Sequence, residues 1–297
     1  MNRRNSGSNN QSMSEFSFIQ LADPQFGMFA SLSAKTDQEI AAFAERGIII
    51  RKANKIEGFA PEVAFFTRAI DRANWLKPSF VVVCGDMINE ADSDEQIAEV
   101  KRIGALLDDS IDLHWVPGNH DVAPDHTIPS QEYVDRYRDN FGPDYYAFSE
   151  GDVRFIVINS TVLTSPKTMS AKAKDQLAFI ESEAIIASQQ STGKQNATRI
   201  VLLSHHPLFI ESANESNNPW SINQKYRKPL IEIAIDHGIV ANFAGHWHRN
   251  NIASDKGIEV VASGPVGYPL GNDPSGFRIV KVNDTSITHE YHSLETD

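Results

Sequence analysis

Short apolar runs rich in β-branched and aromatic residues alternate with segments of helical periodicity along most of this chain. One helix is expected over residues 61–76, where apolar side chains recur every three or four positions. The expected strands are 16–22, 79–85, 111–116, 199–205 and 239–245, and the other expected helices are 36–47, 94–109, 173–190 and 228–238. Repeated strand, helix, strand order builds βαβ units, so the alternation predicts a largely parallel sheet with helices outside it.

Two other regions are typical of antiparallel strands. Residues 145–160 form an expected hairpin with Gly151 and Asp152 at its turn, and three expected strands follow at 257–264, 277–283 and 286–293. No linker rich in Pro, Gly or Ser divides the sequence. We therefore expect an α/β fold in which one domain with two mixed sheets spans residues 15–297, after a disordered polar tail over residues 1–14.

Charge and cysteine content limit the expected partners and location. The 297 residues include 39 acidic and 27 basic ones, a formal net charge of -12, which disfavours nucleic acid because phosphate-backbone contacts need a basic face. The single cysteine, Cys84, allows no internal disulfide and favours a reducing compartment. The sequence has neither an apolar run of transmembrane length nor a signal segment, so no membrane partner and a cytoplasmic location are expected.

Polar side chains follow five of the expected strands, at the point where each strand ends. In chain order they are Asp23 with Gln25, Asp86 with Asn89, Asn119 with His120 and Asp121, His205 with His206, and His246 with His248 and Arg249. In open α/β sheets, ligands bind beyond the carboxyl ends of the strands. The pattern therefore predicts one site that all five strand ends share.

Each of these residues alone has an ordinary explanation, because Asp and Asn end strands and cap helices and a single His is often structural. Together, carboxylate, amide and imidazole donors describe a site for one or two divalent ions. In an extended segment the side chains of His246 and His248 diverge, so each can serve a different ion. Asp86 follows a glycine at the centre of the series and is the expected bridge between two metals.

The motifs DPQ (23–25), GDMIN (85–89), GNHD (118–121), HHP (205–207) and GHWH (245–248) resemble those of the calcineurin-like metallophosphoesterases in order and spacing. Within that superfamily, longer stretches such as GPDYYAF and LGNDPSGFRIV are similar to the calcineurin-like phosphoesterase domain-containing group, described as serine/threonine phosphatases. The resemblance extends from about Phe16 to the C-terminus. It implies a four-layer α-β-β-α sandwich with two mixed sheets.

The resemblance also implies a set of metal ligands. Asp23, Asp86 and His248 would hold the first ion, and Asp86, Asn119, His205 and His246 the second. His206 would then either support these ligands or face the substrate. The expected cofactors are two divalent ions, with Mn, Fe and Zn as the candidates.

Two positions depart from the family pattern. Gln25 stands where the family has a histidine ligand, and its amide is a poorer donor to a borderline ion. The first site is therefore expected to be weak, to select a harder ion such as Mn or Mg, or to be empty on purification. Asn89 replaces an aspartate, and the arginine that follows it in the protein phosphatases is absent. Arg249 and Asn89, together with His206, are the remaining candidates for substrate contact.

These residues predict metal-dependent hydrolysis of a phosphomonoester, by in-line attack of a hydroxide that bridges the metals. His120 would protonate the leaving oxygen, and Asp121 either orients that imidazole or caps the turn. The expected substrate is a phosphorylated small molecule or a phosphoprotein. Two alternatives stay open: a phosphodiesterase of the same superfamily, and a non-catalytic scaffold that holds metal.

Overall fold

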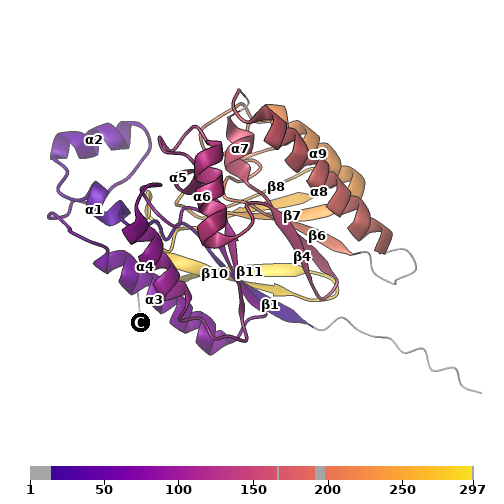
Figure 1. Cartoon of the computed structure of the whole chain (residues 1–297), viewed down its shortest axis with the longest axis horizontal. Helices are drawn as coiled ribbons and strands as arrows, with labels where there is room; N and C mark the ends of the chain where they lie inside the picture. Colours follow the sequence, from indigo (N-terminus) through magenta and orange to yellow (C-terminus); the bar gives the residue numbers. More distant parts are fainter. Residues whose placement is uncertain (1–14, 166, 191–197, 296–297) are drawn as a thin grey trace, which may run out of the picture.

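Two mixed β-sheets form the centre of the molecule (Figure 1), in a computed structural model that describes residues 15–165, 167–190 and 198–295. The expected tail at residues 1–14 lies outside the described residues. The first sheet has the order β11-β10-β1-β2-β3, with β1 (Phe16–Leu21), β2 (Phe80–Cys84), β3 (Asp112–Val116), β10 (Gly276–Val282) and β11 (Ile287–Ser293). Strands β1, β2 and β3 are parallel, and β10 joins β1 antiparallel.

The second sheet has the order β4-β5-β6-β7-β9-β8. Its strands are β4 (Tyr146–Glu150), β5 (Val153–Val157), β6 (Arg199–Leu203), β7 (Ile239–Ala244), β8 (Asn251–Asp255) and β9 (Ile258–Ala262). The four central strands are parallel, and β4 and β8 pair antiparallel at the two edges. The expectation of two mixed sheets is therefore confirmed.

Helices cover the outer face of each sheet (Figure 1). On the first sheet lie α3 (Ala60–Leu76) and α4 (Asp94–Gly104), and on the second lie α8 (Ser170–Gln190) and α9 (Gln224–His237). The remaining helices are α1 (Met28–Leu32), α2 (Asp37–Glu45), α5 (Asn119–Val122), α6 (Gln131–Phe141) and α7 (Ser160–Thr164). The layers are thus helix, sheet, sheet and helix, as the sequence predicts.

Alternation along the strands explains why both sheet faces are buried. Val81 and Val83 of β2 pack toward the helices, while Phe80 and Val82 pack toward the second sheet. At the centre of the seam between the sheets, Phe18 stacks on Phe80 with ring centroids 4.8 Å apart. Strands apolar on both faces are typical of parallel sheets covered by helices.

Several short or polar elements were not expected from the sequence. Helix α6 has few apolar residues, and edge strand β8 is half exposed, so neither carries a strong apolar signal. Helix α9 begins four residues earlier than the expected 228, because the Asn223 side chain caps it by accepting the Lys225 N–H at 3.0 Å. The helix expected to reach residue 109 ends at Gly104.

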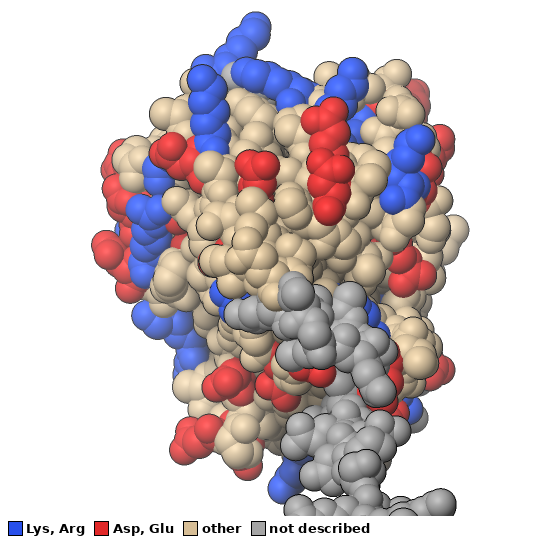
Figure 2. Space-filling view, turned by 90° about the vertical axis from the view of Figure 1, so that its right-hand side faces the viewer, with Lys and Arg blue, Asp and Glu red and all other residues tan. Residues whose placement is uncertain are grey.

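Charges of both signs are mixed on the surface that faces the viewer in Figure 2, with uncharged residues between them. The described residues visible on this face form no continuous basic surface of the kind that a phosphate backbone requires. Among the described residues, no helix combines the length and the apolar character that a membrane span needs.

The segment between β1 and α3 is fastened by a buried glutamate. Glu62, on the first turn of α3, accepts the backbone N–H groups of Gly27 and Phe29, each at 3.0 Å. These groups open α1, whose Met28 packs with Ile50 and Tyr268. The Glu62 side chain is 1 % exposed, and burial raises the pKa of its carboxyl group above the ordinary value.

This raised pKa predicts a pH-dependent stability. The folded chain keeps the Glu62 proton to a higher pH than the unfolded chain does, so this residue's contribution to the free energy of unfolding decreases as pH rises from about 4.5 through the raised pKa. Glu62→Gln cannot titrate, so the unfolding free energy of the wild type minus that of the variant should fall with rising pH. Denaturant unfolding of both proteins from pH 4.5 to 8 measures this, and parallel curves would contradict it.

Candidate metal centre

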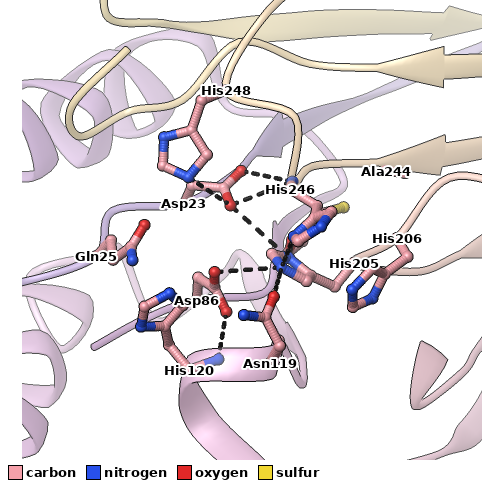
Figure 3. Close-up of polar contacts among 12 residues, drawn as sticks. Asp23, Gln25, Asp86, Asn119, His120, His205, His206, Ala244, His246 and His248 are labelled. Atoms are coloured by element: carbon pink, nitrogen blue, oxygen red, sulfur yellow. Dashed lines mark hydrogen bonds and ion pairs between the residues drawn. The ribbon is translucent and has the colours of Figure 1, made fainter. Parts of the chain in front are cut away.

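The strand ends converge at one place, as the sequence predicts (Figure 3). Asp23 follows β1, Asp86 follows β2, Asn119 begins α5 after β3, and His205 and His246 follow β6 and β7. The loops after β1 and β2 are tied together, since the Asp23 N–H donates to the Gly85 carbonyl at 3.1 Å and the Gln25 N–H to the Asp86 carbonyl at 2.9 Å. The centre therefore combines donors from both sheets.

Many of the residues at this centre have left-handed backbone. Positive φ occurs at Asp23 (48°), Gln25 (36°), Asp86 (50°), His246 (69°) and His248 (52°). Residues with a side chain adopt this conformation at a cost, and such positions cluster at functional sites. Gly118 leaves room for Asp86, because a Cβ at position 118 would collide with the Asp86 carboxylate.

One group of donor atoms surrounds the Nε2 atom of His205. Asn119 Oδ1 lies 2.9 Å from it, His246 Nδ1 3.1 Å and Asp86 Oδ2 3.2 Å. Neighbouring ligands of a divalent ion lie ~3 Å apart when each is ~2.1 Å from the ion. The separations therefore match one coordination sphere.

Backbone carbonyls determine which nitrogen of each imidazole carries the proton. His205 Nδ1 lies 2.9 Å from the Cys84 carbonyl, His246 Nε2 lies 3.0 Å from the Pro219 carbonyl, and His248 Nδ1 lies 2.6 Å from the Tyr268 carbonyl. Each ring donates its proton there and leaves the other nitrogen as an acceptor. Asn119 is oriented in the same way, because its amide nitrogen donates to the His126 carbonyl at 2.9 Å.

The atoms that converge are thus all acceptors when the imidazoles are neutral, and acceptors do not bond one another. A cation resolves this, so the donor set fits a divalent ion held by Asp86, Asn119, His205 and His246. Burial disfavours a charged His205, but the Asp86 and Asp23 carboxylates and the hydrogen bond to the Cys84 carbonyl together outweigh burial and raise the pKa of His205 to about 9.

A second group of donors, formed by Asp23, His248 and Gln25, lies next to the first (Figure 3). His248 Nε2 lies 3.3 Å from Asp23 Oδ1, and both Asp23 oxygens accept the His246 backbone N–H. Gln25 Oε1 is buried and has no hydrogen-bond partner among the described residues, while its amide nitrogen donates to Asn89 at 3.2 Å. An unpaired buried oxygen beside a carboxylate and an imidazole fits a second ion.

His120 and Asp121 make separate contacts in this turn. His120 Nδ1 lies 2.8 Å from the Asn89 carbonyl, which orients the ring, and Nε2 has no hydrogen bond among the described residues. Asp121 contacts backbone only: it accepts the N–H groups of Gly118 and Asp86 at 2.7 and 2.9 Å, and more distantly those of the two residues after Asp86. Of the two roles expected for Asp121, the hydrogen bonds therefore support the second: it caps the turn and holds the loop after β2.

Two of the expected substrate contacts are engaged elsewhere. Arg249 donates through Nε and Nη2 to the Leu270 carbonyl, at 3.2 and 2.8 Å, and through Nη2 also to the Gly47 carbonyl. The Asn89 side chain bonds Gln25 and Glu90. The expectation that Arg249 and Asn89 contact substrate is thus not supported, because internal bonds occupy these groups.

One residue at the centre was missed in the sequence. His126 has a φ of 62° and stacks on His120, with ring centroids 4.0 Å apart, and its carbonyl orients Asn119. It lies in a polar loop after GNHD with no apolar pattern around it. A His on such a loop carries no sequence signal of its own.

A cavity of about 390 Å³ opens beside Asn119, His206 and His246. Hydroxyl and amide side chains form most of the rest of its lining, with Trp220 on one wall, and no Lys or Arg lines it among the described residues. Any anionic group bound there must therefore be balanced by metal ions and imidazoles.

Comparison with known proteins agrees with this geometry. The family model described as calcineurin-like phosphoesterase matches residues 18–250. The serine/threonine-protein phosphatase CPPED1 of Bos taurus is 30% identical over 286 residues, which cover 94% of this chain and 84% of that protein. The CPPED1 of Pongo abelii is 31% identical over 287 residues, with the same coverage of 94% and 84%.

A solved structure has the same fold at low sequence identity. A dimetal phosphatase from Danio rerio superposes with a TM-score of 0.61 and 15% identity, covering 94% of this chain and 99% of that one. The family match covers most of the chain and includes every donor residue of the centre. The protein therefore belongs to the calcineurin-like phosphoesterase family and is a metal-dependent phosphoester hydrolase.

Proposed function

We propose that this protein is a phosphomonoesterase with two divalent ions, and that its substrates are phosphoserine and phosphothreonine in proteins. The observation that carries the proposal is that the Asp86 carboxylate is near both groups of acceptor atoms: its Oδ2 lies 3.2 Å from His205 Nε2, and ligand atoms of Asp23, Asp86 and His205 lie within 4.8 Å of one another. The named activity of the CPPED1 relatives supports the substrate class. The mixture of carboxylate, amide and imidazole donors suits Mn, Fe or Zn.

When bound, two such ions supply positive charge to the phosphoryl oxygens and lower the pKa of water to that of a usable nucleophile. Asp86, Asn119, His205 and His246 would hold one ion, and Asp23, Asp86 and His248 the other, with Gln25 Oε1 as a weaker donor. His120 exchanges a proton with the leaving oxygen through its free Nε2, while the Asn89 carbonyl keeps the ring in place.

The absence of Lys and Arg among the described residues that line the cavity supports a substrate whose leaving group carries no further negative charge. Apart from its histidines, the lining consists of uncharged residues, most of them with hydroxyl or amide side chains, and Trp220 offers an aromatic face. A substrate with additional anionic groups would find no Lys or Arg among the described lining residues. This favours a phosphorylated side chain over a nucleotide or a polyphosphate.

Phosphate release by protein stripped with chelator and refilled with Mn²⁺ tests the proposal. We expect metal-dependent hydrolysis of p-nitrophenyl phosphate and of a phosphoserine peptide, and little hydrolysis of bis(p-nitrophenyl) phosphate. A preference for the diester would make the protein a phosphodiesterase instead. Metal binding that stabilises the protein without hydrolysis of either ester would identify a non-catalytic scaffold.

A further inference from the structure

His206 is a buried imidazole beside the metal centre that has no place in the ligand set described above. Its side chain faces the cavity, and its ring centroid lies 4.0 Å from that of His246. Figure 3 places it on the far side of His205 and His246 from Asp23. One of its ring nitrogens lies within 4.8 Å of the donor atoms of both neighbouring histidines.

Ser160, at the start of α7, determines the tautomer of this ring. The Ser160 hydroxyl oxygen accepts the His206 backbone N–H at 2.8 Å and lies 3.0 Å from His206 Nδ1. Ser160 is completely buried, and Nδ1 is the one acceptor recorded for its hydroxyl proton among the described residues. A hydroxyl proton without an acceptor is rare in a protein interior, so Ser160 donates to Nδ1 and the neutral ring carries its proton on Nε2.

The tautomer gives the cavity a fixed donor. No hydrogen bond of His206 Nε2 is recorded among the described residues, so its N–H is available to a ligand in the cavity. A metal ligand would need the opposite tautomer, with the lone pair on Nε2. A phosphoryl group presents acceptor oxygens only, and the described lining residues include no Lys or Arg to meet them.

We propose that His206 is a substrate-binding residue that donates its Nε2–H to an oxygen of the bound phosphoryl group, and that Ser160 is its positioning residue. The proposal rests on the proposed phosphatase function, since it assigns a donor to the same site. It predicts that phosphate binding and metal binding respond separately to changes at His206.

The first experiment compares His206→Met with His206→Gln in protein refilled with Zn²⁺. We expect both variants to bind as much zinc as the wild type. The inhibition constant of inorganic phosphate against p-nitrophenyl phosphate should rise roughly 3- to 10-fold in His206→Met, which has no donor. His206→Gln should recover part of this loss, because its amide nitrogen can replace the Nε2–H.

The second experiment reads the tautomer directly and does not depend on a variant that folds. In the zinc-loaded wild type labelled with ¹⁵N-histidine, the His206 resonances should show the proton on Nε2. Ser160→Ala should mix the two tautomers and raise the KM for p-nitrophenyl phosphate more than it lowers kcat. A proton on Nδ1 in the wild type would overturn the proposal.

Calorimetric titration with inorganic phosphate separates this inference from the proposed function. If the wild type hydrolyses esters but His206→Met binds phosphate unchanged, the His206 role is wrong and the phosphatase stands. If His206→Met loses zinc, His206 is a metal ligand and the inference also fails. If the wild type does not hydrolyse esters but loses phosphate affinity in His206→Met, the inference stands and the phosphatase function does not.

Discussion

Asp86→Asn is expected to lower kcat/KM for p-nitrophenyl phosphate by at least about 10³-fold, or ~4 kcal/mol of transition-state stabilisation. The amide keeps the shape of the side chain and an oxygen that can accept the His120 backbone N–H, a bond of 2.9 Å in the wild type. It removes the negative charge that faces both groups of donors, and it can place an N–H against His205. Both the affinity for metal and the turnover should fall.

The measurement is metal content by elemental analysis together with turnover after refilling with Mn²⁺. Asp139→Asn, at an exposed position on α6, is the matched control and should behave as the wild type. Full metal content and full activity in Asp86→Asn would show that Asp86 does not bridge two ions. Full metal content without activity would show that Asp86 is not needed for metal binding but is needed for turnover.

His120→Asn should have an effect that depends on the leaving group. The asparagine amide can still donate to the Asn89 carbonyl, but it lacks the ring nitrogen that exchanges a proton with the leaving oxygen. For a phosphoserine peptide, whose alkoxide leaves poorly without a proton, kcat should fall ~10²- to 10⁴-fold. For p-nitrophenyl phosphate, whose phenolate leaves readily, the loss should be much smaller.

Parallel assays of His120→Asn and His237→Asn on both substrates test this, since His237 ends α9 on the outer layer. Metal content should be unchanged in both variants. An equal loss of kcat on the two substrates would assign His120 a role in charge stabilisation or in folding, and would contradict proton transfer to the leaving group.

Two mixed sheets with outer helices and the convergence of the donors could be predicted because both follow from chain periodicity, whereas the four-layer order was implied by the family resemblance. Strand ends of a parallel sheet lie at one edge, so Asp23, Asp86 and Asn119 had to be neighbours once β1, β2 and β3 were identified. To place the histidines after β6 and β7 at the same site, one must also know that the strands of the second sheet end on the same side of the molecule as those of the first. The family motifs supplied this, and the described structure agrees.

Backbone detail could not be predicted, because it depends on residues far away in the sequence. Periodicity gives no indication that Asp23 and His246 have left-handed backbone, or that a carbonyl as distant as Tyr268 sets the tautomer of His248. The sequence could not decide between the two roles of Asp121, because a carboxylate next to an imidazole in sequence need not contact it in space. It also gave no indication of the bonds of Arg249, whose acceptors, the Leu270 and Gly47 carbonyls, lie 21 residues later and 202 residues earlier.

The distribution of the donors between two sheets has a consequence for how the chain is made. During synthesis the oxygen donors Asp23, Asp86 and Asn119 emerge first, and the imidazoles of His205, His246 and His248 emerge only after the second sheet has begun. Asp23 meets a backbone N–H that lies 223 positions later. Of the ligands of this centre, a nascent chain therefore presents only the oxygen donors at first, so the centre cannot hold the borderline ions that imidazole favours tightly before most of the protein has been translated.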